Sequence, residues 1–391
     1  MRNSYGRGTL PTLIDNYPRN GYSFIYNLFT HKTICISTKK LMNVSDELCA
    51  KMRNCGILVD DNEKEQNAVL NYYEENAGNT DELVVMLFLT RKCNCKCIYC
   101  YEDQQNAKFS DMSDTAYVTD VIIRLMDELD VKKLKIIFYG GEPLIKSPMI
   151  SAISKFLFTR LKENYSFSIV TNGTLIKKNE FEMWNKLGLK AIKVTLDGEM
   201  MSHNKRRPYA NGEGSYVDIL NNLSEIKELT HIVVNIVLDA SVTGIEKLVM
   251  DLRARKIEPE ISLCLIETNN YTVDQKSKLV IEKTMLLAKM NILQSTKIAF
   301  DHGIICMGKN VHSIGIDANN VVYRCNGNLD SKIGTLSDKI KKDFIPVKKQ
   351  CVECKYLPIC FGGCLYELKC EKEYFEKTIP DLVKAYAKFE I

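Results

Sequence analysis

The stretch TRKCNCKCIYCYED, residues 90–103, places four cysteines within eight positions of the chain. It directly follows LVVMLFL, residues 83–89, an apolar run that predicts a buried strand and is far too short to span a bilayer. A loop that leaves a parallel strand at its carboxyl end lies where such folds build their sites. The thiols of this loop could form disulfides, hold zinc or hold an iron-sulfur cluster.

Disulfides are the least expected of the three. The chain opens MRNSYGRGTLPTLIDNYPRN, which lacks the cationic start, apolar core and cleavage site of an export signal. We therefore expect a cytoplasmic protein whose thiols stay reduced. The 15 cysteines then serve mainly as metal ligands or catalytic thiols.

The composition indicates a globular protein with a sizeable core. Of the 391 residues, 45% are hydrophobic, which supports one large domain with smaller ones beside it. The formal net charge of +4 is too small for a dedicated nucleic-acid binder, and the basic run KRR at residues 205–207 is isolated. We expect this run on a solvated face, and neither nucleic acid nor a membrane as a partner.

Short runs rich in Val and Ile recur along the middle of the chain and alternate with predicted helices. The strands are expected within residues 83–89, 133–143, 167–174, 191–198, 231–240 and 260–267, and two of the helices within residues 114–129 and 178–188. This alternation predicts parallel βα units and a partial (β/α)6 TIM-like barrel. Several strands end in glycine or polar residues, which we expect to converge on the cysteine loop.

The spacing of the loop cysteines leaves zinc and iron open. Cys93, Cys97 and Cys100 form C-x3-C-x2-C, with Cys95 as an extra thiol. Three thiolates can hold three corners of a 4Fe-4S cube and leave one iron uncovered, whereas a structural zinc site takes four protein ligands. All four thiols could serve zinc by local counting.

In this context the sequence resembles the radical S-adenosylmethionine (SAM) enzymes, whose cysteine motif matches Cys93, Cys97 and Cys100, with the aromatic Tyr99 before the third cysteine. The motif GGEP is similar to the segment of that family that receives the methionine end of SAM. The resemblance assigns the SAM pocket to Tyr99, Gly140, Gly141, Glu142, Pro143, Thr171, Asn172 and Asp197. Glu142 would offer its anion to the SAM ammonium. Standing alone, GGEP would be an ordinary turn with an exposed carboxylate.

The resemblance also implies a reaction type. The amino and carboxylate groups of SAM fill the uncovered iron, the reduced cluster passes one electron to the sulfonium, and a 5′-deoxyadenosyl radical abstracts hydrogen from the substrate. The electron would come from a low-potential donor such as flavodoxin or ferredoxin. The sequence assigns no catalytic residue of the protein itself.

A second group of cysteines occupies the C-terminal part of the chain. Its spacing, C-x2-C-x5-C-x3-C with a trailing cysteine, resembles the SPASM extension, which carries two auxiliary clusters and brings the total to three 4Fe-4S clusters. The resemblance assigns Cys306, Cys325 and Cys364 to the first auxiliary cluster and Cys351, Cys354, Cys360 and Cys370 to the second. Asn320 stands where that motif usually has glycine, and Asn tolerates a left-handed turn. A zinc ribbon is the alternative.

Only three thiolates are available to the first auxiliary cluster, although a cube has four irons. We expect an open iron or a ligand such as Asp301 or His302. An open iron would suit a substrate thiolate, because iron favours soft sulfur ligands. The cysteines without a motif, Cys35, Cys49, Cys55, Cys95 and Cys264, are expected to be small buried hydrophobes.

The sequence predicts three regions: a small α+β module at residues 1–80, the barrel at residues 81–270, and a bridging and SPASM region at residues 271–391. The first contains two expected strands, a helix, a short strand at residues 57–59 and a second helix that Gly78 ends. This order resembles a winged-helix module that recognises leader peptides. A structural cap is the alternative.

These features together favour a peptide maturase that acts on a ribosomally made precursor, with thioether formation as the favoured bond. Two alternatives remain. In sulfatase-maturing enzymes an Asp commonly follows the cysteine equivalent to Cys325 and is the suspected base, whereas Asn326 stands here and an amide is no useful base. A non-catalytic electron carrier is the other alternative. His203, Arg206 and Arg207 could approach the site, but a surface loop explains them equally well.

Overall fold

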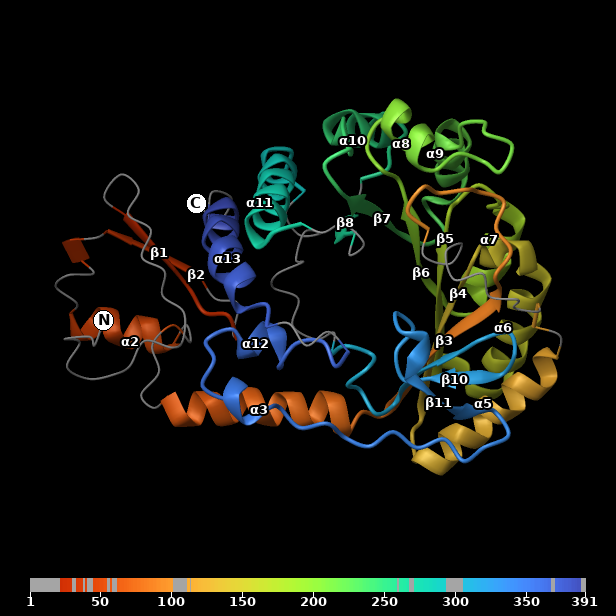
Figure 1. The fold of residues 1–391 in the computed structure, drawn as a ribbon, viewed down its shortest axis with the longest axis horizontal. Helices are drawn as coiled ribbons and strands as arrows, with labels where there is room; N and C mark the ends of the chain where they lie inside the picture. The colour runs from red at the N-terminus through yellow and green to blue at the C-terminus, as the bar shows by residue number, and fades with distance from the viewer. Residues whose placement is uncertain are drawn as a thin grey trace. The chain divides into compact units, whose positions relative to one another are not determined.

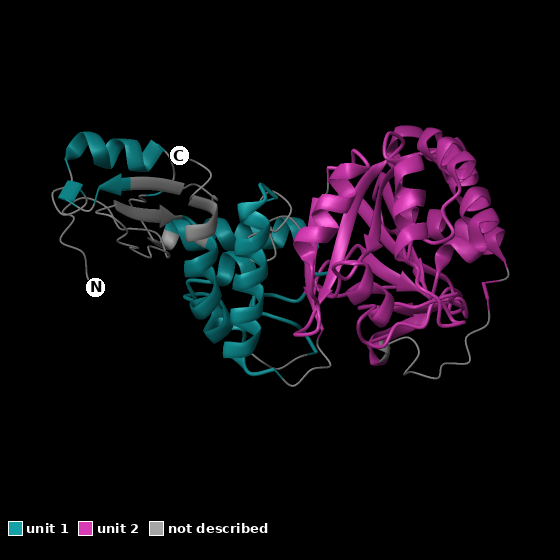
Figure 2. Cartoon of the chain, turned by 90° about the horizontal axis from the view of Figure 1, so that it is seen from above, with its two compact units in different colours: residues 1–78, 271–306, 345–391 teal, residues 79–270, 307–344 magenta. Residues whose placement is uncertain are grey.

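The computed structural model describes residues 22–29, 33–37, 39–40, 45–54, 57, 62–100, 111–112, 114–258, 260–266, 271–292, 305–366 and 370–387. The chain forms two compact units (Figure 2). The larger unit contains residues 79–270 and 307–344, and the smaller one contains residues 1–78, 271–306 and 345–391. In the described part of the chain, every helix is too short or too polar to cross a membrane.

A parallel sheet forms the centre of the larger unit (Figure 1). Its strands are β3 (Glu82–Thr90), β4 (Lys133–Gly140), β5 (Tyr165–Thr171), β6 (Leu189–Thr195), β7 (His231–Leu238) and β8 (Glu260–Leu265). They pair side by side in chain order, and no described pairing joins β8 back to β3. The expected α/β fold with six parallel strands in consecutive order is confirmed, and the sheet is open rather than closed.

Helices cover the outer face of this sheet (Figure 1). They are α5 (Thr115–Leu129), α6 (Ser147–Leu161), α7 (Lys178–Lys186), α8 (Met200–Arg206), α9 (Tyr216–Ile226) and α10 (Ile245–Ala254). The strands show a matching alternation: in β5, Tyr165, Phe167 and Ile169 are buried, whereas Ser166 and Ser168 are partly exposed. Because successive side chains point to opposite faces, the apolar face packs on the helices and a more polar inner face remains.

Three further strands extend the sheet beyond β3. They are β9 (Ser313–Ile316), β10 (Val321–Tyr323) and β11 (Lys332–Thr335), and β9 pairs parallel with β3. Residues 307–344 therefore group with the barrel rather than with the rest of the expected region 271–391, although the first segment of the larger unit does end at residue 270. Asn320, in the turn from β9 to β10, has a φ of 63°, the left-handed conformation that the sequence predicted it could tolerate.

The smaller unit joins both ends of the chain. Its elements are β1 (Tyr22–Tyr26), β2 (Thr33–Ser37), α2 (Asp46–Asn54), α3 (Asn62–Gly78), α11 (Val273–Lys289), α12 (Leu357–Cys360) and α13 (Lys372–Ala387). The two expected strands pair antiparallel. Of the short strand expected at residues 57–59, only Ile57 is described, and it lies in a bend. Single 3-10 turns complete the fold: η1 (Pro143–Lys146), η2 (Lys162–Asn164), η4 (Leu329–Ser331) and η5 (Lys349–Cys351).

The N-terminal helix α3 packs against the cysteine-rich C-terminal segment. Val69 and Tyr73 share one buried cluster with Leu357 and Phe361, and the Tyr73 hydroxyl donates a 2.7 Å hydrogen bond to the carbonyl of Ile345. Burying two aromatic rings in one cluster contributes several kcal/mol, roughly 1.5–3 for each side chain. Residues 1–80 are therefore no separate module, in contrast to the sequence-based expectation.

Candidate functional site

The cysteine loop leaves β3 at its carboxyl end and then runs beside residues 206–210. Backbone hydrogen bonds join Lys96 N to the Pro208 carbonyl at 2.8 Å and Ile98 N to the Arg206 carbonyl at 3.0 Å. Cys95 forms an antiparallel bridge with Tyr209 in the same ladder. These backbone bonds fix the loop at the rim of the sheet. Cys95 is half-buried rather than fully buried.

The end of β4 lies directly against the start of this loop. Gly141 N donates to the Thr90 carbonyl at 3.0 Å, and Glu142 N donates to the Lys92 carbonyl at 2.9 Å. A Cβ atom at Gly140 would lie 2.3 Å from the Thr90 carbonyl oxygen, and one at Gly141 would lie 2.5 Å from the Lys92 carbonyl oxygen. The two glycines of GGEP are therefore needed for β4 to reach the cysteine loop.

Glu142 is fully buried and joins the end of β4 to the end of β5. One carboxylate oxygen accepts from Leu144 N at 2.9 Å and from Thr171 Oγ1 at 2.7 Å, and the other accepts from Asn172 N at 2.7 Å. The alternative of an ordinary turn with an exposed carboxylate is therefore wrong. Burial raises the pKa of Glu142 to about 7, although the three hydrogen bonds oppose that shift. Pro143 follows at the first position of η1.

Asn172 connects the end of β5 to the cysteine loop. Its side-chain nitrogen donates to Asn94 Oδ1 at 2.8 Å and lies 3.8 Å from the Cys93 sulfur. Its oxygen accepts from the backbone nitrogen and the hydroxyl of Thr174. The pKa of the Cys93 thiol is lowered to about 6, chiefly by a hydrogen bond from Cys95, which favours the thiolate that a metal needs. The expected convergence of these strand ends is observed.

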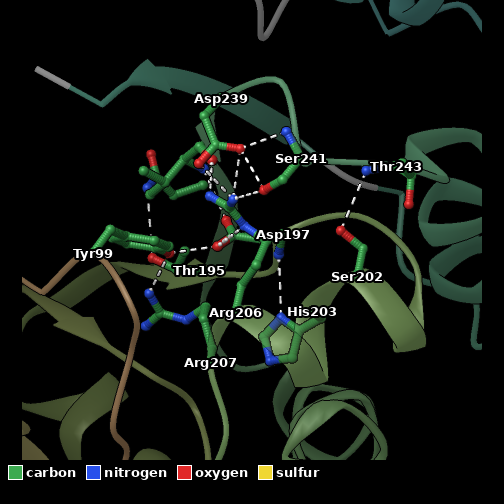
Figure 3. A network of polar contacts seen from close by, with 12 residues as sticks. Tyr99, Thr195, Asp197, Ser202, His203, Arg206, Arg207, Asp239, Ser241 and Thr243 are labelled. Carbon is green, nitrogen blue, oxygen red and sulfur yellow. Dashed lines mark hydrogen bonds and ion pairs between the residues drawn. The ribbon is translucent and has the colours of Figure 1, made fainter. Parts of the chain in front are cut away.

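Tyr99, which precedes Cys100 in the cysteine loop, connects that part of the loop to the end of β6 (Figure 3). Its hydroxyl donates to Asp197 and accepts a 2.7 Å hydrogen bond from Arg207. Asp197 is fully buried, and its other oxygen accepts from Val237 N of β7 at 2.9 Å. Burial raises the pKa of Tyr99, so the phenol stays protonated and remains a donor.

Arg206 holds the ends of β6 and β7 together. It pairs with Asp197 at 3.2 Å and with Asp239 at 2.7 Å, and it donates to the Val237 carbonyl at 2.8 Å. Its guanidinium also lies 4.9 Å from the centre of the Tyr99 ring. The residue is 1% exposed, so the expectation of a solvated face is wrong for Arg206. A planar fork with five donors can serve several acceptors at once, which explains why Arg stands here.

His203 is also buried, not on a surface loop. Its Nδ1 accepts from Asp197 N at 3.2 Å (Figure 3). Its Nε2 lies 3.0 Å from the Ser215 hydroxyl, which donates to the Arg207 carbonyl. Burial, with Arg207 and Arg206 nearby, lowers the pKa of His203 to about 3, so the ring is neutral. His203 therefore supports the backbone of Asp197.

Sequence reasoning missed two carboxylates at this rim. Asp111 accepts from Thr90 Oγ1 at 2.6 Å and pairs with Lys92 and Lys146 at 2.8 Å, which lowers its pKa. Asp239, the partner of Arg206, directly follows β7. Its place after a strand is the signal that pointed to Asp197 and could have found Asp239 too. Asp111 has no such signal.

The donor set of the loop fits an iron-sulfur cube. Among the described residues, no three Cys, His, Asp or Glu side chains converge closely enough to hold one metal ion, as a zinc site would require. The thiolates of a cube each bind a different iron and therefore stay further apart. Cys93, Cys97 and Cys100 are accessible on a loop that is fixed by its backbone.

The auxiliary-cluster thiols are only partly described. Cys351, Cys354 and Cys360 lie on consecutive turns, where Cys354 N donates to the Cys351 carbonyl at 3.0 Å. The three thiols expected to hold the first auxiliary cluster come from both units, so their convergence stays a prediction. The suggested fourth ligands Asp301 and His302, like Cys35 and Cys55, lie outside the described residues and side chains. Cys264 is exposed, so the expectation of a buried thiol is wrong there.

The fold and the loop define a class of protein: an open parallel α/β barrel with a three-cysteine loop at its carboxyl rim. The chain matches the Radical SAM superfamily over residues 87–251, a range that includes the cysteine loop and the ends of β3 to β7. Residues 87–251 are therefore a radical SAM domain, a domain found in enzymes.

Curated relatives are similar to part of the chain. The chain is 32% identical over 148 residues to an uncharacterized protein of Methanocaldococcus jannaschii, which covers 37% of this chain and 48% of that protein. It is 31% identical over 152 residues to a probable GTP 3′,8-cyclase of Archaeoglobus fulgidus, covering 38% and 47%. The chain thus spans about half the length of these relatives.

Solved structures are similar over more of the chain. Native anSMEcpe with bound AdoMet and the Cp18Cys peptide has a TM-score of 0.62 at 17% identity, covering 78% of this chain and 99% of that one. SuiB of Streptococcus suis bound to the precursor peptide SuiA has a TM-score of 0.52 at 15% identity, covering 90% and 95%. At these identities the likeness shows the fold.

Proposed function

We propose that this protein is a radical SAM peptide maturase that abstracts hydrogen from a ribosomally made precursor peptide in the cytoplasm. The observation that carries the proposal is the convergence of the cysteine loop with three strand ends, through Glu142, Asn172 and Asp197. A site built from several strand ends is positioned by rigid elements and keeps its geometry.

The residues at the rim would hold the cofactors in place. Cys93, Cys97 and Cys100 would ligate one 4Fe-4S cluster, which supplies the electron that cleaves SAM. The ends of β4, β5 and β6 would line the SAM pocket, with Tyr99 fixed beside it by Asp197. Glu142 already accepts three hydrogen bonds from the protein, so its main contribution would be to fix the backbone of the pocket.

A peptide substrate is supported by two features. The solved structures that share this fold over most of the chain include anSMEcpe and SuiB with bound peptides. The smaller unit also presents β1 and β2 as a two-stranded sheet, each with an edge that no other described strand covers. An extended leader peptide would add to one of these edges.

The C-terminal thiols would hold two auxiliary clusters in a SPASM arrangement. Cys351, Cys354, Cys360 and Cys370 would form one site, and Cys306, Cys325 and Cys364 the other. The second set lacks a fourth thiolate, and an iron left open there would bind a substrate cysteine as its thiolate. This favours thioether formation. A flavodoxin or ferredoxin would supply the electron.

Sulfatase maturation is the weaker candidate. Asn326 is buried, and neither its side-chain oxygen nor its nitrogen has a hydrogen-bond partner among the described residues. An amide in this position cannot take a proton from a substrate. GTP cyclase activity is favoured only by sequence identity to curated relatives, and that identity covers about half of the relative's length.

The proposal is tested by incubating anaerobically reconstituted protein with SAM and dithionite. We expect 5′-deoxyadenosine, and additional product when a substrate peptide is added. Intact clusters without 5′-deoxyadenosine would contradict an enzyme and favour an electron carrier. Hydrogen exchange with a modified peptide then tests β1 and β2: absence of added protection on both strands would make this region a cap.

A further inference from the structure

The inner face of the sheet carries a polar patch below the rim. Parallel register places Lys193 of β6 beside Val170 of β5, and Asn235 of β7 between Thr195 and Ser262. Residues paired in parallel register share a face, so these side chains lie on the partly exposed face opposite the helices. We define the inner patch as Lys193, Asn235 and Ser262.

Lys193 forms no direct ion pair with any residue that the structure describes. Its Nζ donates to the Ser262 hydroxyl at 3.2 Å. Glu260, a nearby carboxylate on β8, pairs with His231 instead. Partial burial lowers the pKa of Lys193, although Cys264 and Glu260 oppose the shift. A half-buried ammonium that lacks a direct ion pair gains free energy from a ligand that supplies an anion within hydrogen-bond distance.

Asn235 gives a second, independent sign of a missing ligand. It is 9% exposed, and its side-chain oxygen has no hydrogen-bond partner in the described structure. Its nitrogen donates to Thr195 Oγ1 at a long 3.5 Å. Buried acceptors are nearly always satisfied, so a donor belongs at this position. The inner patch therefore offers one cation and one acceptor.

We propose that the inner patch binds a carboxylate of the substrate peptide, which Lys193 and Ser262 hold while Asn235 accepts a peptide N–H group. This inference rests on the proposed peptide-modifying function and names the substrate chemistry. Lys193 precedes Thr195, at the end of β6, by two residues, about 7 Å along the strand. A peptide anchored there passes the rim and places a neighbouring residue beside Tyr99 and Asp197.

The test is affinity selection from a defined peptide mixture. Holoenzyme with SAM is mixed with random synthetic 12-residue peptides that contain one fixed cysteine, made with either free or amidated carboxyl ends, and retained peptides are read by mass spectrometry. We compare the wild type with Lys193→Gln and Lys193→Glu. Lys190→Gln is the matched control, because Lys190 is exposed on the same strand. Circular dichroism checks that each variant is folded.

We expect the wild type and Lys190→Gln to retain acidic peptides preferentially. Lys193→Gln should weaken their retention about tenfold or more, as for a lost charged hydrogen bond, and Lys193→Glu should favour basic peptides. A preference that disappears with amidated ends identifies the C-terminal carboxylate, and one that persists identifies Asp or Glu. If Lys193→Gln retains acidic peptides as strongly as the wild type does, the inference about the inner patch is wrong, and the proposed function is unaffected. If the wild type retains no peptide, both the inference about the inner patch and the proposed peptide-modifying function are contradicted.

Discussion

The hydroxyl of Tyr99 donates to the buried carboxylate of Asp197, across 98 positions of sequence. The bond connects the residue before the third loop cysteine with the end of β6. Arg207 donates to the same hydroxyl, and Arg206 pairs with the same carboxylate. The position of the third cysteine therefore depends on a charged network that belongs to other strands.

Replacing Cys93, Cys97 and Cys100 together with alanine should abolish 5′-deoxyadenosine formation. Because each cube is held by its own thiolates, the iron content should fall by about one cube of three per chain. Cys95→Ala is the control: it removes the hydrogen bond that favours the Cys93 thiolate but none of the three ligands, so it should change both quantities far less. Continued SAM cleavage by the triple variant would contradict the assignment of the open cluster.

Tyr99→Phe should destabilise the rim without removing a ligand. The change takes a donor from Asp197 and an acceptor from Arg207, a loss of roughly 1–3 kcal/mol in the free energy of unfolding. Urea unfolding of the reduced chain measures it. Tyr117→Phe, on the outer helix α5 where Tyr117 is 38% exposed, is the control and should change stability little. An effect equal to that control would show that the network does not fix the loop.

Arg206→Met should be the most destabilising of these changes. It leaves the carboxylates of Asp197 and Asp239 without their shared cation, and unpairing a buried ion pair removes about 3–5 kcal/mol of stability. Lys205→Met changes the adjacent, exposed residue and should have little effect. Thermal unfolding midpoints separate the two. Similar midpoints would mean that the pairs contribute nothing to stability.

Glu142 should make stability depend on pH. Its folded-state pKa of about 7 lies above the ordinary value of 4.5, so the folded chain binds more protons than the unfolded chain between those values. The associated stability is present below about pH 4.5 and is lost as the pH rises through 7. Glu142→Gln should remove that slope from urea unfolding curves. If the unfolding free energy of Glu142→Gln depends on pH as it does in the wild type, ionisation of Glu142 does not destabilise the fold.

The same variant tests the SAM pocket. If Glu142 also binds the SAM ammonium, Glu142→Gln should weaken SAM binding by roughly 1.5–3 kcal/mol, the value of a charge-assisted hydrogen bond. Isothermal titration calorimetry under anaerobic conditions measures the affinity. An unchanged affinity would leave Glu142 as a residue that only joins β4 to β5.

The sequence by itself determined the cysteine loop, the order of the parallel strands and the motifs at their ends. These are local properties, because a strand is encoded by alternation within a few residues and a cluster loop by cysteine spacing. GGEP is an example: the sequence motif marks Gly141, and the structure gives the reason for glycine there, because a neighbouring carbonyl oxygen occupies the place of a Cβ atom.

Only the tertiary structure decided which charged residues are buried. Arg206 and His203 follow β6 in a segment that reads as a polar loop, yet contacts with Asp197 and Asp239 take both out of water. The packing of α3 on the C-terminal segment likewise joins residues far apart in the sequence, such as Tyr73 and Ile345, which are 272 positions apart. Such pairings depend on which surfaces the folded elements bring together, and no local pattern encodes them.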